Sequence, residues 1–150
     1  MLTLNEVLEL LKAELLTLSN CKDVSICTYE NLLIRASESK NKYMHVFLVY
    51  DLRAVTLGEW PQELPLTIVV ADKLRANKEN ERYIHSNTLS LSIEIVKLLR
   101  AWAQRNGWDG IDQVQADIWT EDEADALLGG TKFDLLLKGN IGGYCDIMIN

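Results

Sequence analysis

The longest regular pattern in this chain is a helical repeat of apolar residues that begins near Ser86 or Asn87 and ends at Asn106-Gly107, a favourable C-cap. At about 100° per residue, its apolar arc is roughly 200° wide, about twice what contact with one sheet requires. Such a helix must be covered on more than one side. The polar residues share one narrow stripe, made of Ser90, Glu94, Lys97, Gln104 and Arg105.

The N-terminal segment offers the second cover. Thr3-Leu4-Asn5-Glu6 reads as a capping box, in which the Thr and Glu side chains satisfy each other's backbone amides. Apolar residues then recur at helical spacing and predict a helix over about residues 4–18. We expect this helix to cover the central helix, and a neighbouring subunit is the alternative cover.

Strand patterns lie on both sides of the central helix. Residues 43–50 and 66–70 are nearly continuous apolar runs, which predict strands buried on both faces, and residues 24–28 predict a shorter strand. Alternation predicts further strands at 114–118 and 133–137, the latter in a hairpin with 145–149. We expect loops or turns at 37–42, 58–65, 72–82 and 120–125.

This order of elements predicts an α+β fold: a largely antiparallel sheet with the N-terminal helix and the long central helix packed on one face. A regular β-α-β alternation is missing, which disfavours a doubly wound sheet. The 150 residues show no internal repeat and no break in composition, so we expect a single domain over residues 1–150.

Composition and charge exclude several classes of function. With 48% hydrophobic and 25% charged residues, the chain has the composition of a soluble globular protein. A formal charge of −7 repels phosphate backbones and anionic lipids, so we expect neither specific nucleic-acid binding nor membrane binding. The first residues lack the pattern of a signal peptide, and we expect a protein made in the cytosol.

The residues that could carry chemistry are few. Cys21, Cys27 and Cys145 are odd in number and widely spaced, which argues against a disulfide framework and for reduced thiols. The acidic run at 121–125 lacks the glycine of a calcium loop and is better explained as a solvated turn. Gly129-Gly130 lacks a phosphate-binding pattern, and we interpret it as a turn.

A hydrolase built on Asp72, His85 and Ser86 is a further hypothesis. No nucleophile elbow surrounds Ser86, and a role as helix N-cap accounts for it. We therefore predict no catalytic, cofactor-binding or metal-binding residue, no cofactor and no enzymatic activity.

The tryptophans are better candidates for function. Trp60, Trp108 and Trp119 adjoin predicted loops and turns, and tryptophan is enriched at protein interfaces because it buries a large area. Packing over the ends of the core is the equally weighted alternative. We include the three residues among the candidate interface residues.

Two segments carry a family resemblance. The segment 67–80 has a strand followed by the pattern D-x-L-x-x-(D/N)-x-x-N, and it leads into the segment 84–88 and the central helix. The segment 118–130 is similar to F-T-E-x-x-x-D-x-L-x-G and precedes an alternating strand and a terminal Y-C-x-I. Over about residues 66–148 the chain resembles small tail-completion or tail-terminator proteins of long-tailed phages and prophages.

The resemblance implies a structural role. Such proteins are α+β subunits that close into a ring, commonly a hexamer, which caps the tail tube and joins it to the head-side connector protein. The implied location is the virion tail or neck, assembled in the cytoplasm of the bacterial host. The implied contact residues are Asp72, Asn77, Asn80, Glu121 and Asp125. The alternative is a cytosolic protein-binding adaptor module without catalysis.

Overall fold

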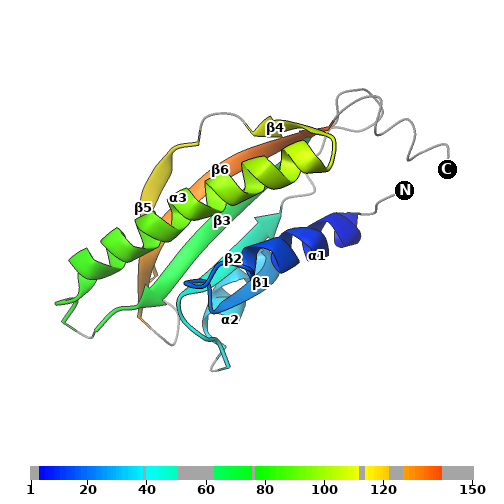
Figure 1. The fold of residues 1–150 in the computed structure, drawn as a ribbon. Coiled ribbons are helices and arrows are strands. Elements are labelled where there is room, and N and C mark those ends of the chain that lie inside the picture. The colour runs from blue at the N-terminus through cyan, green and yellow to red at the C-terminus, as the bar shows by residue number, and fades with distance from the viewer. Residues whose placement is uncertain are drawn as a thin grey trace.

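The computed structural model describes residues 4–38, 40–50, 63–75, 77–111, 114–121 and 127–139 (Figure 1). The first half holds the helix α1 (Leu4–Leu15), the strand β1 (Asp23–Thr28), a 3-10 turn η1 (Tyr29–Asn31), the short helix α2 (Leu32–Ala36) and the strand β2 (His45–Tyr50). The second half holds β3 (Glu63–Lys73), α3 (Glu81–Arg105), β4 (Trp108–Ile111), β5 (Ala116–Glu121) and β6 (Leu128–Gly139).

The described strands form one six-stranded sheet in the order β1-β2-β3-β6-β4, with β5 also paired to β6. Only β1 and β2 are parallel, since η1 and α2 carry the chain from one to the other, and all other pairs are antiparallel. The predicted α+β class with a largely antiparallel sheet is confirmed.

The main core lies between the sheet and the pair α1 and α3, which cover the same face (Figure 1). Leu11 and Leu15 of α1 are fully buried in one cluster with Leu99 of α3. At the surface, Arg105 Nη2 of α3 lies 3.3 Å from Glu14 Oε1 of α1. The N-terminal helix therefore covers part of the wide apolar arc of α3, as predicted.

A second, smaller cluster lies on the opposite face, where α2 packs through Ala36 and Leu32. It holds Phe47 and Val49 of β2, whereas Val46 and Leu48 point into the main core. The predicted burial of this strand on both faces is thus confirmed. The short helix α2 was not predicted, because five residues are too few to show a helical repeat.

The long helix begins earlier than predicted. α3 starts at Glu81 and its N-cap is Asn80, so Ser86 is an exposed residue inside the helix and its prediction as N-cap is wrong. Among the first residues of α3 only Ile84 is buried. Because a single apolar residue gives no helical repeat, the sequence did not predict this first turn of α3. The helix ends at Arg105, and Gly107 follows with φ of 76°, consistent with the predicted C-cap.

Three predicted loops are partly strand. Pro65 lies in β3 opposite Leu136, although residues 58–65 were predicted as a loop. β2 pairs with β3 only as far as Leu66, so Pro65 lies where one edge of β3 has no described partner, and its missing amide costs little.

The other two predicted loops, 72–82 and 120–125, are shorter than expected. Asp72 and Lys73 end β3, Glu81 and Arg82 begin α3, and Thr120 and Glu121 end β5. Residues 58–62 and 122–126 lie outside the described residues.

The glycine pair lies within β6 and not in a turn. A Cβ atom on Gly130 would lie 1.8 Å from the carbonyl oxygen of Val70, so only glycine lets β6 approach β3 at this point. The predicted turn was wrong because glycine also marks close contact between strands. Of the predicted hairpin between 133–137 and 145–149, the first half lies in β6 and the second half lies outside the described residues.

We predict that Gly130→Ala lowers the free energy of unfolding by about 3 kcal/mol or more, because the new methyl group meets backbone. Gly129→Ala is the matched control. Its Cβ would meet only the end of the Leu74 side chain, at 2.9 Å, which can move, so we expect a loss of about 1 kcal/mol. Urea unfolding of both variants makes the comparison, and equal losses would contradict the packing described for Gly130.

Candidate functional site

An apolar groove of about 550 Å³ lies between α3 and the segment that leads into β5. Leu89, Ile93 and Val96 of α3 form one wall, and Val114 and Ala116 lie across from them. The remaining lining residues are Ser92, Lys97, Arg100, Gln115 and Phe133. β5 runs beside the N-terminal part of α3 in the fold (Figure 1).

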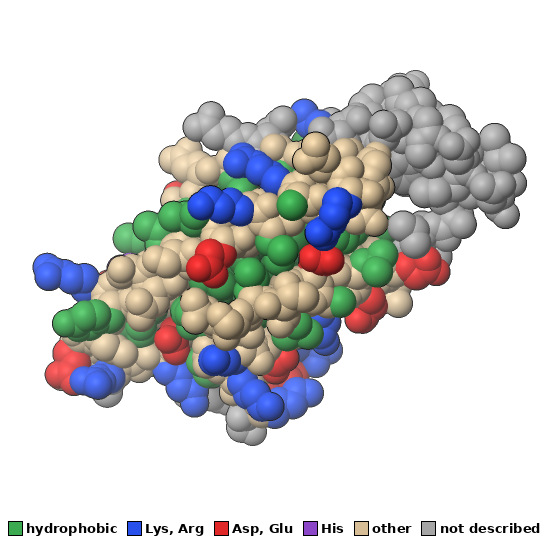
Figure 2. Space-filling model, in the orientation of Figure 1, with side chains coloured by type: hydrophobic (Ala, Val, Ile, Leu, Met, Phe, Trp, Pro, Cys, Tyr) green, Lys and Arg blue, Asp and Glu red, His purple; other side chains and the backbone are tan. Residues whose placement is uncertain are grey.

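Two large apolar side chains of α3 that line the groove are exposed, and a third exposed apolar side chain lies on the neighbouring strand β5. Leu89 is 45% exposed and Ile93 is 49% exposed on α3, and Ile118 of β5 is 67% exposed. Figure 2 shows hydrophobic side chains at the surface between α3 and β5. Adjacent exposed apolar groups of this kind mark surfaces that bind other molecules. This is the part of the α3 arc that α1 leaves uncovered.

The strand beside the groove is an edge strand. β5 pairs with β6 on one side, and among the described residues no strand pairs with its other side. Residues 116 and 118 share the face of Phe133 and Thr131, their partners on β6, which is the α3 face. An exposed edge offers unpaired amides and carbonyls that can bind an added strand. Groove and edge together can hold an extended segment with apolar residues at alternate positions.

The rim of the groove is basic. Lys97 and Arg100 line it, whereas the whole chain carries a formal charge of −7. Lys and Arg side chains lie beside the hydrophobic ones in Figure 2. An acidic or neutral partner is therefore favoured at this rim over a basic one.

Four of the predicted interface residues come together at one end of the sheet. Asp72 and Thr120 both pair with Gly129 in register, and the neighbouring row joins Glu121, Leu128 and Lys73. Asn77 and Asn80 follow in the loop between β3 and α3. The structure thus brings Asp72, Asn77, Asn80 and Glu121 to the same end of the molecule. A contact role for them stays a prediction.

Asn80 also has a structural task. Its Oδ1 accepts a hydrogen bond from the amide of Arg75 at 2.8 Å, and its Nδ2 donates to the carbonyl of Lys73 at 3.2 Å. These two bonds fasten the loop to the end of β3. Asn77 is exposed and bonds only locally, to the amide and the carboxylate of Glu79.

Trp108 and Trp119 do not share one surface. Trp119 pairs with Gly130 and packs against the second cluster. Trp108 lies in β4 at the other end of the sheet and packs on the main core, with its ring centroid 6.2 Å from that of Trp102. Trp60 and Asp125 lie outside the described residues.

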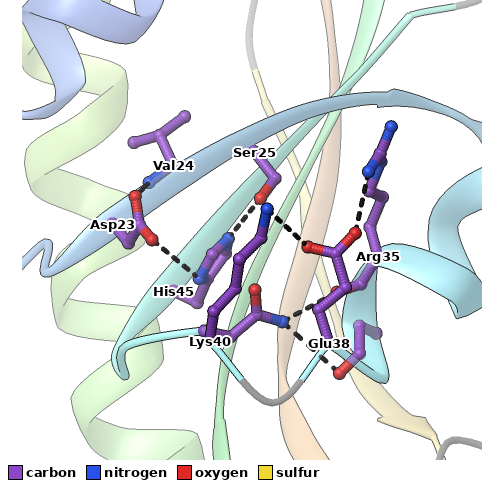
Figure 3. Close-up of polar contacts among 9 residues, drawn as sticks. Asp23, Val24, Ser25, Arg35, Glu38, Lys40 and His45 are labelled. Carbon is purple, nitrogen blue, oxygen red and sulfur yellow. Dashed lines mark hydrogen bonds and ion pairs between the residues drawn. The ribbon is translucent and has the colours of Figure 1, made fainter.

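A polar cluster that the sequence did not reveal lies between β1 and β2 (Figure 3). The Oγ of Ser25 lies 2.8 Å from Nε2 of His45, and Oδ2 of Asp23 lies 4.0 Å from Nδ1 of the same ring. The parallel register places Asp23 opposite His45, and only the register brings these residues together. The sequence carries no local signal for it.

Burial decides the charge of this histidine. The His45 side chain is 0% exposed and stacks on Phe47 at 4.4 Å, and loss of hydration lowers its pKa below the usual 6.5. The charge of Asp23 and the carbonyl of Lys42 favour the charged form, but they do not offset the burial. The ring is therefore neutral at pH 7. Nδ1 has no hydrogen-bond partner of normal geometry, and the Asp23 carboxylate lies 4.0 Å from it.

The cluster has the residue types of a nucleophile, a base and an acid. A general base must become charged during the reaction, and burial opposes that charge on His45. We interpret this polar cluster as a hydrogen-bonded part of the sheet face that carries α2 and the smaller apolar cluster.

Within the described stretches, no group of three His, Cys, Asp or Glu side chains could hold a metal ion. His85 and Ser86 lie in the first turns of α3, where Nε2 of His85 is 3.9 Å from Glu81 Oε1.

No protein-family model matches this chain, and no curated protein matches its sequence. The phage likeness therefore rests on the two segments that carry it, 67–80 and 118–130. None of the helices in the described part of the chain has the length and apolarity needed to cross a membrane.

We predict that Asn80→Ala lowers the free energy of unfolding by about 1–2 kcal/mol, because two backbone groups of the loop lose their partner. Asn77→Ala should change it by less than about 0.5 kcal/mol, because its bonds are exposed. Denaturant unfolding measures both. If Asn77→Ala costs as much as Asn80→Ala, the fastening role of Asn80 is refuted.

We also predict a pH dependence of stability that originates at His45. Its pKa is lower in the folded than in the unfolded state, so its contribution is fully present above pH about 6.5 and is lost as the pH falls below that value. His45→Gln should reduce the fall in unfolding free energy between about pH 7.5 and 5.5. An identical slope in His45→Gln and the parent protein would argue against a neutral, buried His45.

Proposed function

We propose that the chain is a structural subunit that assembles into a ring at the neck or tail of a phage or prophage, where it caps the tail tube and joins it to the head-side connector. The observation that carries the proposal is the apolar groove between α3 and β5, with Leu89, Ile93 and Ile118 exposed beside an open strand edge.

The groove supports assembly for a thermodynamic reason. Each large apolar side chain that stays in water forgoes about 1.5–3 kcal/mol that full burial would supply. α3 already has α1 and the sheet as neighbours, so only another chain or segment can bury Leu89 and Ile93. A groove on one copy that binds a different surface of the next copy gives a head-to-tail contact, and such contacts form a ring when the rotation from copy to copy closes.

The family resemblance is the reason for proposing a hexameric ring in particular. It implies a hexamer and names Asp72, Asn77, Asn80, Glu121 and Asp125 as contacts, of which the first four lie at one end of the sheet. A cluster at one end suits contact with a tail tube or a connector. The groove on the flank of α3 is then left for the neighbouring subunit.

The adaptor hypothesis uses the same groove for a different partner. An adaptor binds one heterologous protein and stays a monomer or a dimer in its absence. A ring subunit instead associates with itself as its concentration rises. Self-association therefore separates the two hypotheses.

We predict that native mass spectrometry detects multimers, with a hexamer as the limiting species. Ile93→Glu should weaken the association at least about tenfold, because a charge replaces an apolar contact. Ile34→Glu is the matched control, since Ile34 is 64% exposed on α2 and far from the groove in the fold. We expect it to leave assembly unchanged.

A chain that stays monomeric at every concentration, alone and with tail tube and connector proteins, would refute the ring. Equal losses in Ile93→Glu and Ile34→Glu would place the contact away from the groove. Circular dichroism and urea unfolding of both variants confirm that each is folded before its assembly is compared.

A further inference from the structure

β6 has neighbours on both sides. β3 pairs with it from Leu128 to Lys138, β5 pairs with it from Leu128 to Phe133, and β4 pairs with it near Gly139. Among the described residues, positions 134–136 lack a partner on the side of β4 and β5, and Gly139 lacks one on the side of β3. A strand that folds back from β6 as a simple hairpin would compete with strands already in place.

Residues 140–150 nevertheless have the pattern of a strand. Cys145, Ile147 and Ile149 alternate with Tyr144, Asp146 and Met148, so one face of an extended segment is apolar. The groove and the β5 edge require a segment of this kind. Its backbone would pair with β5, and its apolar residues would enter the groove beside Ile118 and Ile93. The segment carries no basic residue that Lys97 and Arg100 of the rim would repel.

The segment of the same chain does not reach far enough. An antiparallel strand on β5 enters beside Glu121, which pairs with Leu128. Gly139 lies eleven residues farther along β6, or about 36 Å at ~3.3 Å per residue. The chain from Gly139 to Cys145 spans at most about 21 Å. A parallel strand on β5 enters beside Ala116, which pairs with Phe133, six residues or about 20 Å from Gly139. In the same chain this distance would use nearly the whole reach of about 21 Å before any reversal after β6.

We propose that residues 140–150 of a second copy of this chain bind the groove between α3 and β5 as an antiparallel strand on the free edge of β5. Ile147 and Ile149 fill the groove, and Cys145 faces the same side as Thr120 or Ile118. This exchange of segments rests on the proposed self-assembly and identifies the surfaces that make it. Each copy offers one groove and one segment at different places, so successive copies join head to tail.

Disulfide trapping with the native Cys145 tests the exchange. Thr120→Cys and Ile118→Cys place a thiol on the groove face of β5, in the two registers that keep Cys145 on that face. Asp117→Cys is the matched control, since Asp117 is as exposed but lies on the opposite face. Cys21 and Cys27 are buried with their pKa raised to about 11, so they react slowly. The intact chain is oxidised with diamide and separated on a denaturing gel without reductant.

We expect disulfide-linked multimers from at least one groove-facing variant, about tenfold more than from Asp117→Cys, because the geometry of a disulfide is narrow. Adding Cys145→Ser should abolish them. Equal yields from both faces, or a disulfide within one chain, would overturn the proposal. Multimers in native mass spectrometry without the disulfide would overturn the exchange but leave the ring standing. A monomer in that measurement would overturn both.

Discussion

Burial of the α3 apolar surface is the constraint on which the rest of the structure depends. The helix is long, and its apolar side chains extend around far more of its circumference than the sheet alone can cover. In the main core α1 covers part of this surface, where Leu11 and Leu15 pack in one cluster with Leu99 of α3. The cover is incomplete, because Leu89 and Ile93 stay about half exposed along the side that borders β5. Among the described residues, the unpaired edge of β5 and the exposed flank of α3 therefore meet at the same place.

Much of this fold could be predicted from the sequence. The amphipathic repeats of α1 and α3, the doubly buried β2 and the alternation of β6 are set by local patterns that burial enforces. Where patterns were weak, predictions failed. The first turn of α3 has one buried residue, Ile84, which is too few for a helical repeat. Gly130 was predicted to form a turn, because the sequence does not show that a Cβ atom there would lie 1.8 Å from the carbonyl oxygen of Val70.

The candidate site depends on how the strands pair more than on local patterns of apolar residues. The sequence alone could therefore show little of it. The wide arc of α3 indicated an uncovered surface, yet the groove needs β5 beside the helix, and that follows from the register of Ala116 with Phe133. In the same way Asp72 and Glu121 come to one end of the sheet only through β6, and Ser25 meets His45 only through parallel pairing. Such placements are properties of topology, and no single segment encodes them.

Coverage of the groove by another copy is most directly tested by hydrogen–deuterium exchange of the intact chain at several concentrations. β5 amides that point away from β6 have no described partner, so they exchange rapidly in a free subunit. If a strand from a second copy covers the edge, exchange of residues 116–121 slows as concentration rises, together with that of residues 140–150, while α2 stays unchanged. If multimers form and the exchange of residues 116–121 does not slow, the assembly uses another surface and this account is contradicted.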